Sequence, residues 1–300
     1  MMNNKKELHG IINYETGEVK GYLHIKEGQE VKLVDTKQVE AHKNRLEVKE
    51  ALKTYGDYFH LRYIYQQPIF KEMIQDLGIN KANTHIIRLL KLASYLSWNN
   101  TLYDDNRHRI KKSSLSKIWG ITNRTRINET FKLLTKYNYI YMEGDYIMVN
   151  EQIISKGAIK TDKNSTYTRV FIDSLQELYD NSEPKKRKQL GYLFNILPFI
   201  HYDWNILCWN PTEQDVDKLE LMSWTDLASV CGIEADSRNI SRLKKDLYTL
   251  RVNGNKVIGE FKTGYRKTDY KIVINPALFY AGSKIDSLVG VIKLFEAGGK

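Results

Sequence analysis

The sequence of 300 residues has little cysteine and no long apolar run. Its two cysteines, Cys208 and Cys231, lack the CxxC spacing of zinc and redox sites, so we expect two buried, reduced thiols. The first residues lack the apolar core of a signal peptide, and no segment approaches a membrane span. These absences predict a cytoplasmic protein that neither spans a membrane nor binds a metal.

Motifs for nucleotide binding and catalysis are also missing. Gly254 and Gly259 have the spacing of a phosphate-binding loop, but Glu260 stands where such a loop has lysine. None of the seven histidines belongs to the metal-binding His-hydrophobic-His pair of rolling-circle nickases. His85 and Arg88 have the His-x-x-Arg spacing of tyrosine recombinases, but the chain before them is too short for the upstream arginine of such a site. We therefore predict no enzymatic activity and no cofactor.

Positive charge is in excess and concentrated. The chain has 46 Lys and Arg against 36 Asp and Glu, a formal net charge of +10. Between Arg107 and Lys136, nine cations stand against one acid, Glu129. Such a concentration is typical of a surface that binds a polyanion. With 42% hydrophobic residues, the chain is also long enough to bury the cores of two domains.

A helix, a glycine turn and a second helix are predicted over residues 113–137. Leu115 and Ile118 recur at a helical spacing and should face a core. Gly120 supplies a left-handed turn residue, and Asn123 can cap the second helix. The segment therefore predicts a helix-turn-helix, with its polar second helix available to read the major groove.

The same pattern returns about 112 residues later. The four positions that repeat are Leu115, Ile118, Gly120 and Ile121, which match Leu227, Val230, Gly232 and Ile233. A second candidate reading helix begins near Ser237, and the closing segments 145–157 and 269–282 also correspond. Because three elements match in the same order, we predict two copies of one domain.

A hairpin is predicted after each reading helix. The first has a tight, acidic turn at residues 143–145, which is poor for phosphate contact. The second is longer and has a basic tip, which suits contact with the DNA backbone or minor groove.

Basic and polar side chains of these elements are the candidate DNA contacts, since arginine and asparagine pair with purine edges and lysine with phosphates. In the first copy they are Lys111, Lys112, Ser113, Asn123, Arg124, Thr125, Arg126, Asn128 and Lys132. In the second copy they are Ser237, Arg238, Asn239, Ser241, Arg242 and Lys245, with Lys262, Tyr265, Arg266 and Lys267 on the hairpin.

The predicted fold class is α+β, mostly α, with two tandem winged helix-turn-helix domains that arose by internal duplication. Residues 1–56 form an arm of a β-hairpin, which turns near Thr16-Gly17, and a polar helix with a thin apolar face. Residues 57–160 form the first winged-helix domain. Residues 161–300 form the second, with a C-terminal helix, after a short polar linker at about 160–166.

The hairpin Glu15-Thr16-Gly17-Glu18, the helix-turn-helix and the closing segment 149–157 resemble the RepL-type plasmid replication initiators of Gram-positive bacteria. Those are small winged-helix proteins with a Ser/Thr-Gly-Glu hairpin and a wing that ends in hydrophobic-Asn-Pro-Glu-Leu and then Gly. The ending here is Val149-Asn150-Glu151-Gln152-Ile153, without the proline, and Ile274-Asn275-Pro276-Ala277-Leu278 in the second copy. The resemblance covers about residues 10–157. The tandem layout is also similar to Rep_3-type initiators.

Both resemblances imply binding to a replication origin, and two functions remain open. The first is a plasmid or phage replication initiator that binds origin repeats. The alternative is a transcription regulator that binds an operator without a role in replication, and an adaptor that coats DNA is a weaker third. The expected partners are double-stranded DNA, a replicative helicase or other replication proteins, and a second copy of the chain.

Overall fold

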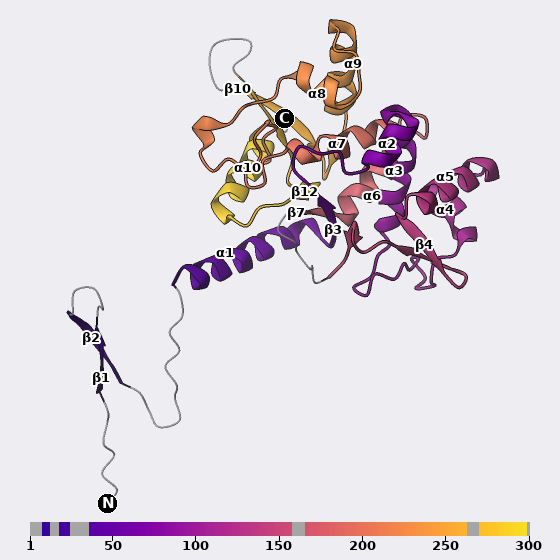
Figure 1. Cartoon of the computed structure of the whole chain (residues 1–300). Helices are drawn as coiled ribbons and strands as arrows, with labels where there is room; N and C mark the ends of the chain where they lie inside the picture. The colour runs from indigo at the N-terminus through magenta and orange to yellow at the C-terminus, as the bar shows by residue number, and fades with distance from the viewer. Residues whose placement is uncertain (1–7, 13–17, 25–35, 158–165, 263–269, 299–300) are drawn as a thin grey trace, which may run out of the picture. The chain divides into compact units, whose positions relative to one another are not determined.

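The computed structural model describes residues 8–12, 18–24, 36–157, 166–262 and 270–298 (Figure 1). These residues form an α+β structure with ten α-helices and several small antiparallel sheets. The chain divides into two compact units, residues 1–44 and residues 45–300.

The first unit contains an antiparallel pair of strands. They are β1 (Leu8–Ile12) and β2 (Val19–His24), with Leu8 opposite His24. This agrees with the predicted N-terminal hairpin, although its predicted turn at Thr16-Gly17 lies outside the described residues.

Helix α1 (Thr36–Leu52) begins in the first unit and ends in the second. Of its larger apolar residues, Val39 and Leu46 are 52% and 50% exposed. Val48 and Leu52, by contrast, are buried in a cluster that also contains Phe171, Tyr280 and Leu288. The end of α1 therefore packs on residues of the predicted second domain, and the boundary between compact units falls at 44/45 instead of the predicted 56/57.

The second unit is built around a four-stranded antiparallel sheet in the order β12-β7-β3-β6. Its strands are β3 (Tyr58–Tyr63), β6 (Ile154–Ser155), β7 (Thr166–Phe171) and β12 (Phe279–Tyr280). The two central strands pair around His60 and Arg169, and a short strand from later in the chain flanks each of them.

Helices from both predicted domains pack beside this sheet. They are α2 (Lys71–Leu77), α3 (Ile79–Ala93), α6 (Ile172–Asn181) and α7 (Gly191–Asn195), the last flanked by 3-10 helices at Arg187–Leu190 and Leu197–Phe199. Most of helix α3 is buried. Residues 190–200 are also buried, but their helix ends at Asn195, because Pro198 has no backbone N–H to continue it.

One hydrophobic core joins the two predicted domains. It contains Phe59 and Trp119 from residues 57–160 and Leu193 and Leu227 from residues 161–300. The predicted boundary at 160/161 therefore does not separate compact units. The predicted linker ends at Thr166, the first residue of β7, and the rest of it lies outside the described residues.

The first predicted helix-turn-helix segment is present as helix, turn and helix. Helix α4 (Leu115–Trp119) ends at Gly120, whose φ is 60°, and α5 (Arg124–Lys136) follows. Oδ1 of Asn123 accepts from the backbone N of Arg126 at 3.0 Å, which is the predicted cap. A hairpin of β4 (Ile140–Glu143) and β5 (Tyr146–Val149) comes next.

The second segment has the same order of elements. Helix α8 (Trp224–Val230) is followed by Gly232, whose φ is 62°, and by α9 (Ser237–Tyr248), which Asp236 caps. Strands β8 (Arg251–Val252) and β9 (Asn255–Lys256) form a small extra pair before the hairpin of β10 (Ile258–Lys262) and β11 (Tyr270–Ile274). In Figure 1, α8 and α9 lie at the top of the second unit and α4 and α5 at its right side. The last described helix is α10 (Ile285–Gly298), which agrees with the predicted C-terminal helix.

Both hairpins close on an asparagine. Nδ2 of Asn150 donates to the carbonyl of Asn138, and Oδ1 accepts from the backbone N–H two residues further on. Asn275 makes the same two bonds, with the carbonyl of Lys256 in place of that of Asn138. These are the asparagines of the wing-ending motif, so a local hydrogen-bond pattern accounts for their recurrence.

Alanine at the two turn glycines is expected to destabilise the chain to different extents. Gly120→Ala should lower the free energy of unfolding by about 1 kcal/mol, mainly because the left-handed conformation is unfavourable for a residue with a Cβ. The added Cβ would lie 3.3 Å from the guanidinium of Arg187. Gly232→Ala should cost about 2 to 4 kcal/mol, because its Cβ would clash with the branched Cγ2 of Ile79. Urea midpoints would measure both costs. Gly290→Ala on α10, where a Cβ meets open space, is the control, and equal costs at the two turns would contradict this packing.

Candidate nucleic-acid interface

The first reading helix presents its predicted polar face outward. Ile127, Thr130 and Leu134 are buried, which fixes the rotation of α5. The candidates on and before α5 are all exposed, namely Asn123, Arg124, Thr125, Arg126, Asn128 and Lys132. Neither Arg124 nor Arg126 forms an ion pair with a carboxylate in the part of the chain that the structure describes. Their guanidinium groups are therefore available to a ligand.

The structure brings four candidates from two segments into one shallow cleft. Lys112 and Ser113 reach it from the turn before α4, and Arg124 and Asn128 reach it from α5. Nζ of Lys112 lies 4.7 Å from the centre of the Phe131 ring, which holds its charge beside α5. The cleft therefore combines groups that suit base edges with groups that suit phosphates.

Lys111 is placed differently from the other candidates. Its Nζ lies 3.4 Å from the carboxylate of Asp145 at the tip of the first hairpin. The neighbouring Arg109 pairs with Glu143 at 2.7 Å. These pairs offset part of the charge surplus that the sequence shows around α4 and α5. Because the Lys111 pair is exposed, it contributes little to stability, and Lys111 could exchange it for a phosphate.

The candidates of the second reading helix are mostly exposed, but some of their polar groups are already hydrogen bonded. Ser237, Arg238, Ser241, Arg242 and Lys245 are exposed, and Asn239 is half-buried.

Three of the second-copy candidates are already hydrogen bonded at the start of α9, and one of them is Ser241, whose hydroxyl donates to the carbonyl of Ser237 at 2.7 Å. Asn239 donates its side-chain N–H to Asp236 at 2.6 Å. Arg242 donates to Oδ1 of Asn239, also at 2.6 Å. To read a base, either side chain must first give up this bond. The two halves thus offer different chemistry to a ligand.

The second hairpin is fastened to both helices of its segment by Glu260. The carboxylate accepts from Trp224 at 2.9 Å, from Tyr248 at 2.8 Å and from Lys244 at 3.2 Å. Burial works to raise the pKa of Glu260, but these hydrogen bonds outweigh it and lower the pKa. Lys262 is exposed at the end of β10, whereas the predicted contacts Tyr265, Arg266 and Lys267 lie outside the described residues.

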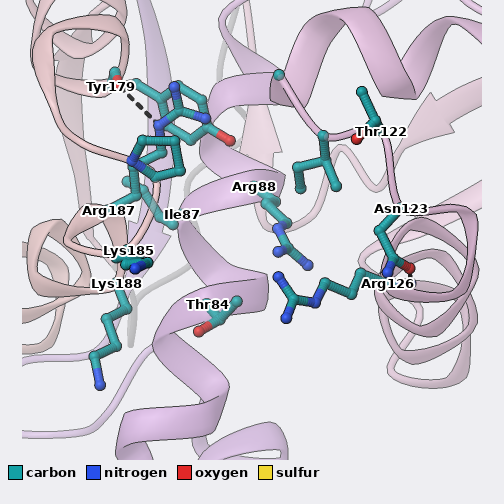
Figure 2. A pocket seen from close by; sticks show the side chains of 13 residues that line it. Thr84, Ile87, Arg88, Thr122, Asn123, Arg126, Tyr179, Lys185, Arg187 and Lys188 are labelled. Atoms are coloured by element: carbon teal, nitrogen blue, oxygen red, sulfur yellow. Dashed lines mark hydrogen bonds between the residues drawn. The ribbon is translucent and has the colours of Figure 1, made fainter.

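Part of the second half also reaches α5, and this was not predicted from the sequence. The segment 183–188 carries four consecutive cations, Lys185 to Lys188, which are a visible signal in the sequence. With α3 and the start of α5 it lines a second cleft, which we name the basic cleft (Figure 2). Its cations are Arg88, Arg126, Lys185, Arg187 and Lys188.

Arg187 connects this segment to the turn before α5. Its Nη1 donates to the carbonyl of Trp119 at 2.8 Å, and its Nε donates to that of Tyr179 at 3.1 Å. The Tyr179 hydroxyl donates to the same Trp119 carbonyl at 2.9 Å, and its ring centre lies 4.2 Å from the Arg187 guanidinium carbon. The position of α5 therefore depends on residues of both halves.

His85 and Arg88, whose spacing is like that of recombinases, are tied to α5. Both contact the hydroxyl of Thr130, His85 through Nδ1 at 3.0 Å and Arg88 through Nη1. Burial and the charge of Arg88 lower the pKa of His85 to about 4, so the ring is neutral at pH 7. These contacts give both residues a structural role between α3 and α5.

Cys208 and Cys231 are both free and buried. Within the described ranges, no group of His, Cys, Asp or Glu is arranged to hold a metal ion. Among the described helices, none combines the length and apolar character needed to cross a membrane.

No protein-family model, curated protein or solved structure matches this chain. Its function is therefore inferred from its sequence and geometry.

Proposed function

We propose that the chain binds specific duplex DNA through two copies of a winged-helix domain and initiates replication of a plasmid or phage at origin repeats. The observation that carries the proposal is the pair Arg124 and Arg126. They are exposed, form no ion pair among the described residues, and stand at the start of a helix that follows a helix-turn-helix turn. Helices of this kind place their first residues against base edges in the major groove.

Several features support duplication. A turn glycine with positive φ precedes each reading helix, at Gly120 and Gly232. Asn150 and Asn275 close the hairpins with matching bonds. In the sheet, β6 flanks β3 as β12 flanks β7. The hairpins after α5 and α9 take the place of wings.

The unlike halves favour an initiator over a regulator. Asn239 is hydrogen bonded to Asp236, the cap of its own helix, whereas Arg124 forms no ion pair among the described residues. Two unlike reading helices in one chain suit an asymmetric site, which can be iterated as direct repeats, better than they suit a palindrome. We further propose that the protein acts in the cytoplasm, as one copy or several, with a replicative helicase as partner and without a catalytic step of its own.

Selection from a pool of random duplexes tests the proposal. The whole chain should enrich an asymmetric site whose unlike half-sites have centres about 10 base pairs, or a multiple of this, apart. Failure to enrich any sequence would contradict specific binding. A plasmid that lacks an origin, given this gene and repeats of the enriched site, should be maintained by an initiator. Enrichment without maintenance would instead favour the regulator.

A further inference from the structure

The basic cleft gathers positive charge from three places in the fold. Arg88 comes from α3, Arg126 from α5, and Lys185, Arg187 and Lys188 come from the segment after α6. The cavity has a volume of about 260 Å³, and none of the described residues that line it is acidic. In Figure 2 the guanidinium groups of Arg88 and Arg126 point toward one another. Like charges that face one another in this way repel unless an anion lies between them.

The charges of the basic cleft are poorly offset within the described part of the chain. Lys185, Lys188 and Arg126 are exposed and form no ion pair with a described carboxylate. Burial lowers the pKa of Arg88, and the nearby Arg126 and Arg187 lower it further, while Tyr179 and Glu129 act in the opposite direction. An anion in the cleft would relieve this repulsion.

The backbone around the basic cleft also favours an anion. Thr122 and Asn123 line it just before the 13-residue helix α5. The N–H groups of the first helical turn and the helix dipole attract negative charge at this end. An oxyanion of tetrahedral shape can accept from several guanidinium and ammonium donors at once.

We propose that the basic cleft binds a phosphate group. The source of this phosphate rests on the proposed function: it belongs to the DNA backbone beside the half-site that α5 reads. The second half of the chain then supplies Lys185 and Lys188 to the site of the first half. The phosphate contact beside the reading helix α5 is thereby formed by two segments about 60 residues apart in the sequence, the start of α5 and the run with Lys185 and Lys188.

The test compares Lys185→Ala/Lys188→Ala with Lys186→Ala. Lys186 belongs to the same basic run but pairs with Glu183 at 3.1 Å and does not line the cleft. Affinity for a mixed-sequence duplex of about 30 base pairs, long enough for two half-sites, would be measured against salt. The double variant should reduce the slope of log affinity against log salt by about 1, the value for one phosphate contact. Lys186→Ala should leave the slope close to that of the unchanged chain.

A second measurement separates the proposal from the proposed function and identifies the source of the phosphate. The melting temperature of the chain without DNA would be compared in sodium phosphate and in sodium chloride of equal ionic strength. One outcome is a melting temperature that is higher in phosphate for the unchanged chain and for Lys186→Ala, but not for the double variant. This result supports the cleft with free phosphate as its ligand, even if the chain binds no duplex. A change of the DNA slope without this rise supports the backbone as the source. If the double variant and Lys186→Ala behave alike in both measurements, the proposal is overturned.

Discussion

A fragment that ends at residue 160 is expected not to fold as it does within the whole chain. It would lose the ladder of β7 on β3, which runs from Tyr58 opposite Phe171 to Tyr63 opposite Thr166. It would also lose the core residues that residues 161–300 contribute, each worth about 1.5 to 3 kcal/mol when buried. Four such residues already account for about 6 to 12 kcal/mol, which is comparable to the total stability of a typical domain.

Thermal melting followed by far-ultraviolet circular dichroism would test this expectation. Residues 1–160 should melt over a broad range or show little native signal. Residues 45–300, which form the second compact unit, are the control and should melt cooperatively. A sharp transition of residues 1–160 near the temperature of the whole chain would show that the first half is independent, against the shared core.

The shared core changes how the two halves would act on DNA. The sequence suggests two domains on a short tether, in which binding of the first raises the effective concentration of the second. In the structure, Asn195 donates to Asn83 across the buried contact between α7 and α3 at 2.8 Å. This packing should therefore fix the spacing of the half-sites. Inserting base pairs between the half-sites should weaken binding to the whole site.

Local signals predicted most of the elements near the candidate interface. The spacing of Leu115 and Ile118 located α4, and Gly120 and Asn123 located the turn and the cap of α5, because each acts through neighbouring residues. The same signals located α8 and α9. The wing-ending asparagines were also visible, since their bonds depend on short-range geometry.

Long-range contacts were not predictable in the same way. The pairing of β3 with β7 joins residues more than 100 positions apart, and a single sequence carries no local signal for it. The bond from Arg187 to Trp119 spans 68 positions. For this reason the basic cleft was missed, although the run of four cations at 185–188, three of which line it, is plain in the sequence. The engagement of Asn239 by Asp236 was missed for a different reason, because a polar residue near a cap can bond locally or face a ligand.

Replacing Arg124 and Arg126 together with Ala is expected to remove the preference for the first half-site. Each arginine that makes a bidentate contact with a guanine should contribute about 1 to 3 kcal/mol of discrimination. Each loss corresponds to about a 5- to 150-fold change in the affinity ratio between the selected site and a mixed duplex. Both side chains are exposed, so the variant should keep its melting temperature. Gel-shift titrations on the two duplexes would measure the ratio.

Two comparisons make this prediction specific. Lys49→Ala/Lys293→Ala removes two exposed cations from α1 and α10 and should leave the ratio unchanged. The single variants should differ from one another, because Arg126 lines the basic cleft and Arg124 does not. Arg124→Ala should reduce preference with little change in the salt slope, whereas Arg126→Ala should also lower the slope by about 1. If the double variant keeps the full preference for the selected site, base reading does not occur at α5.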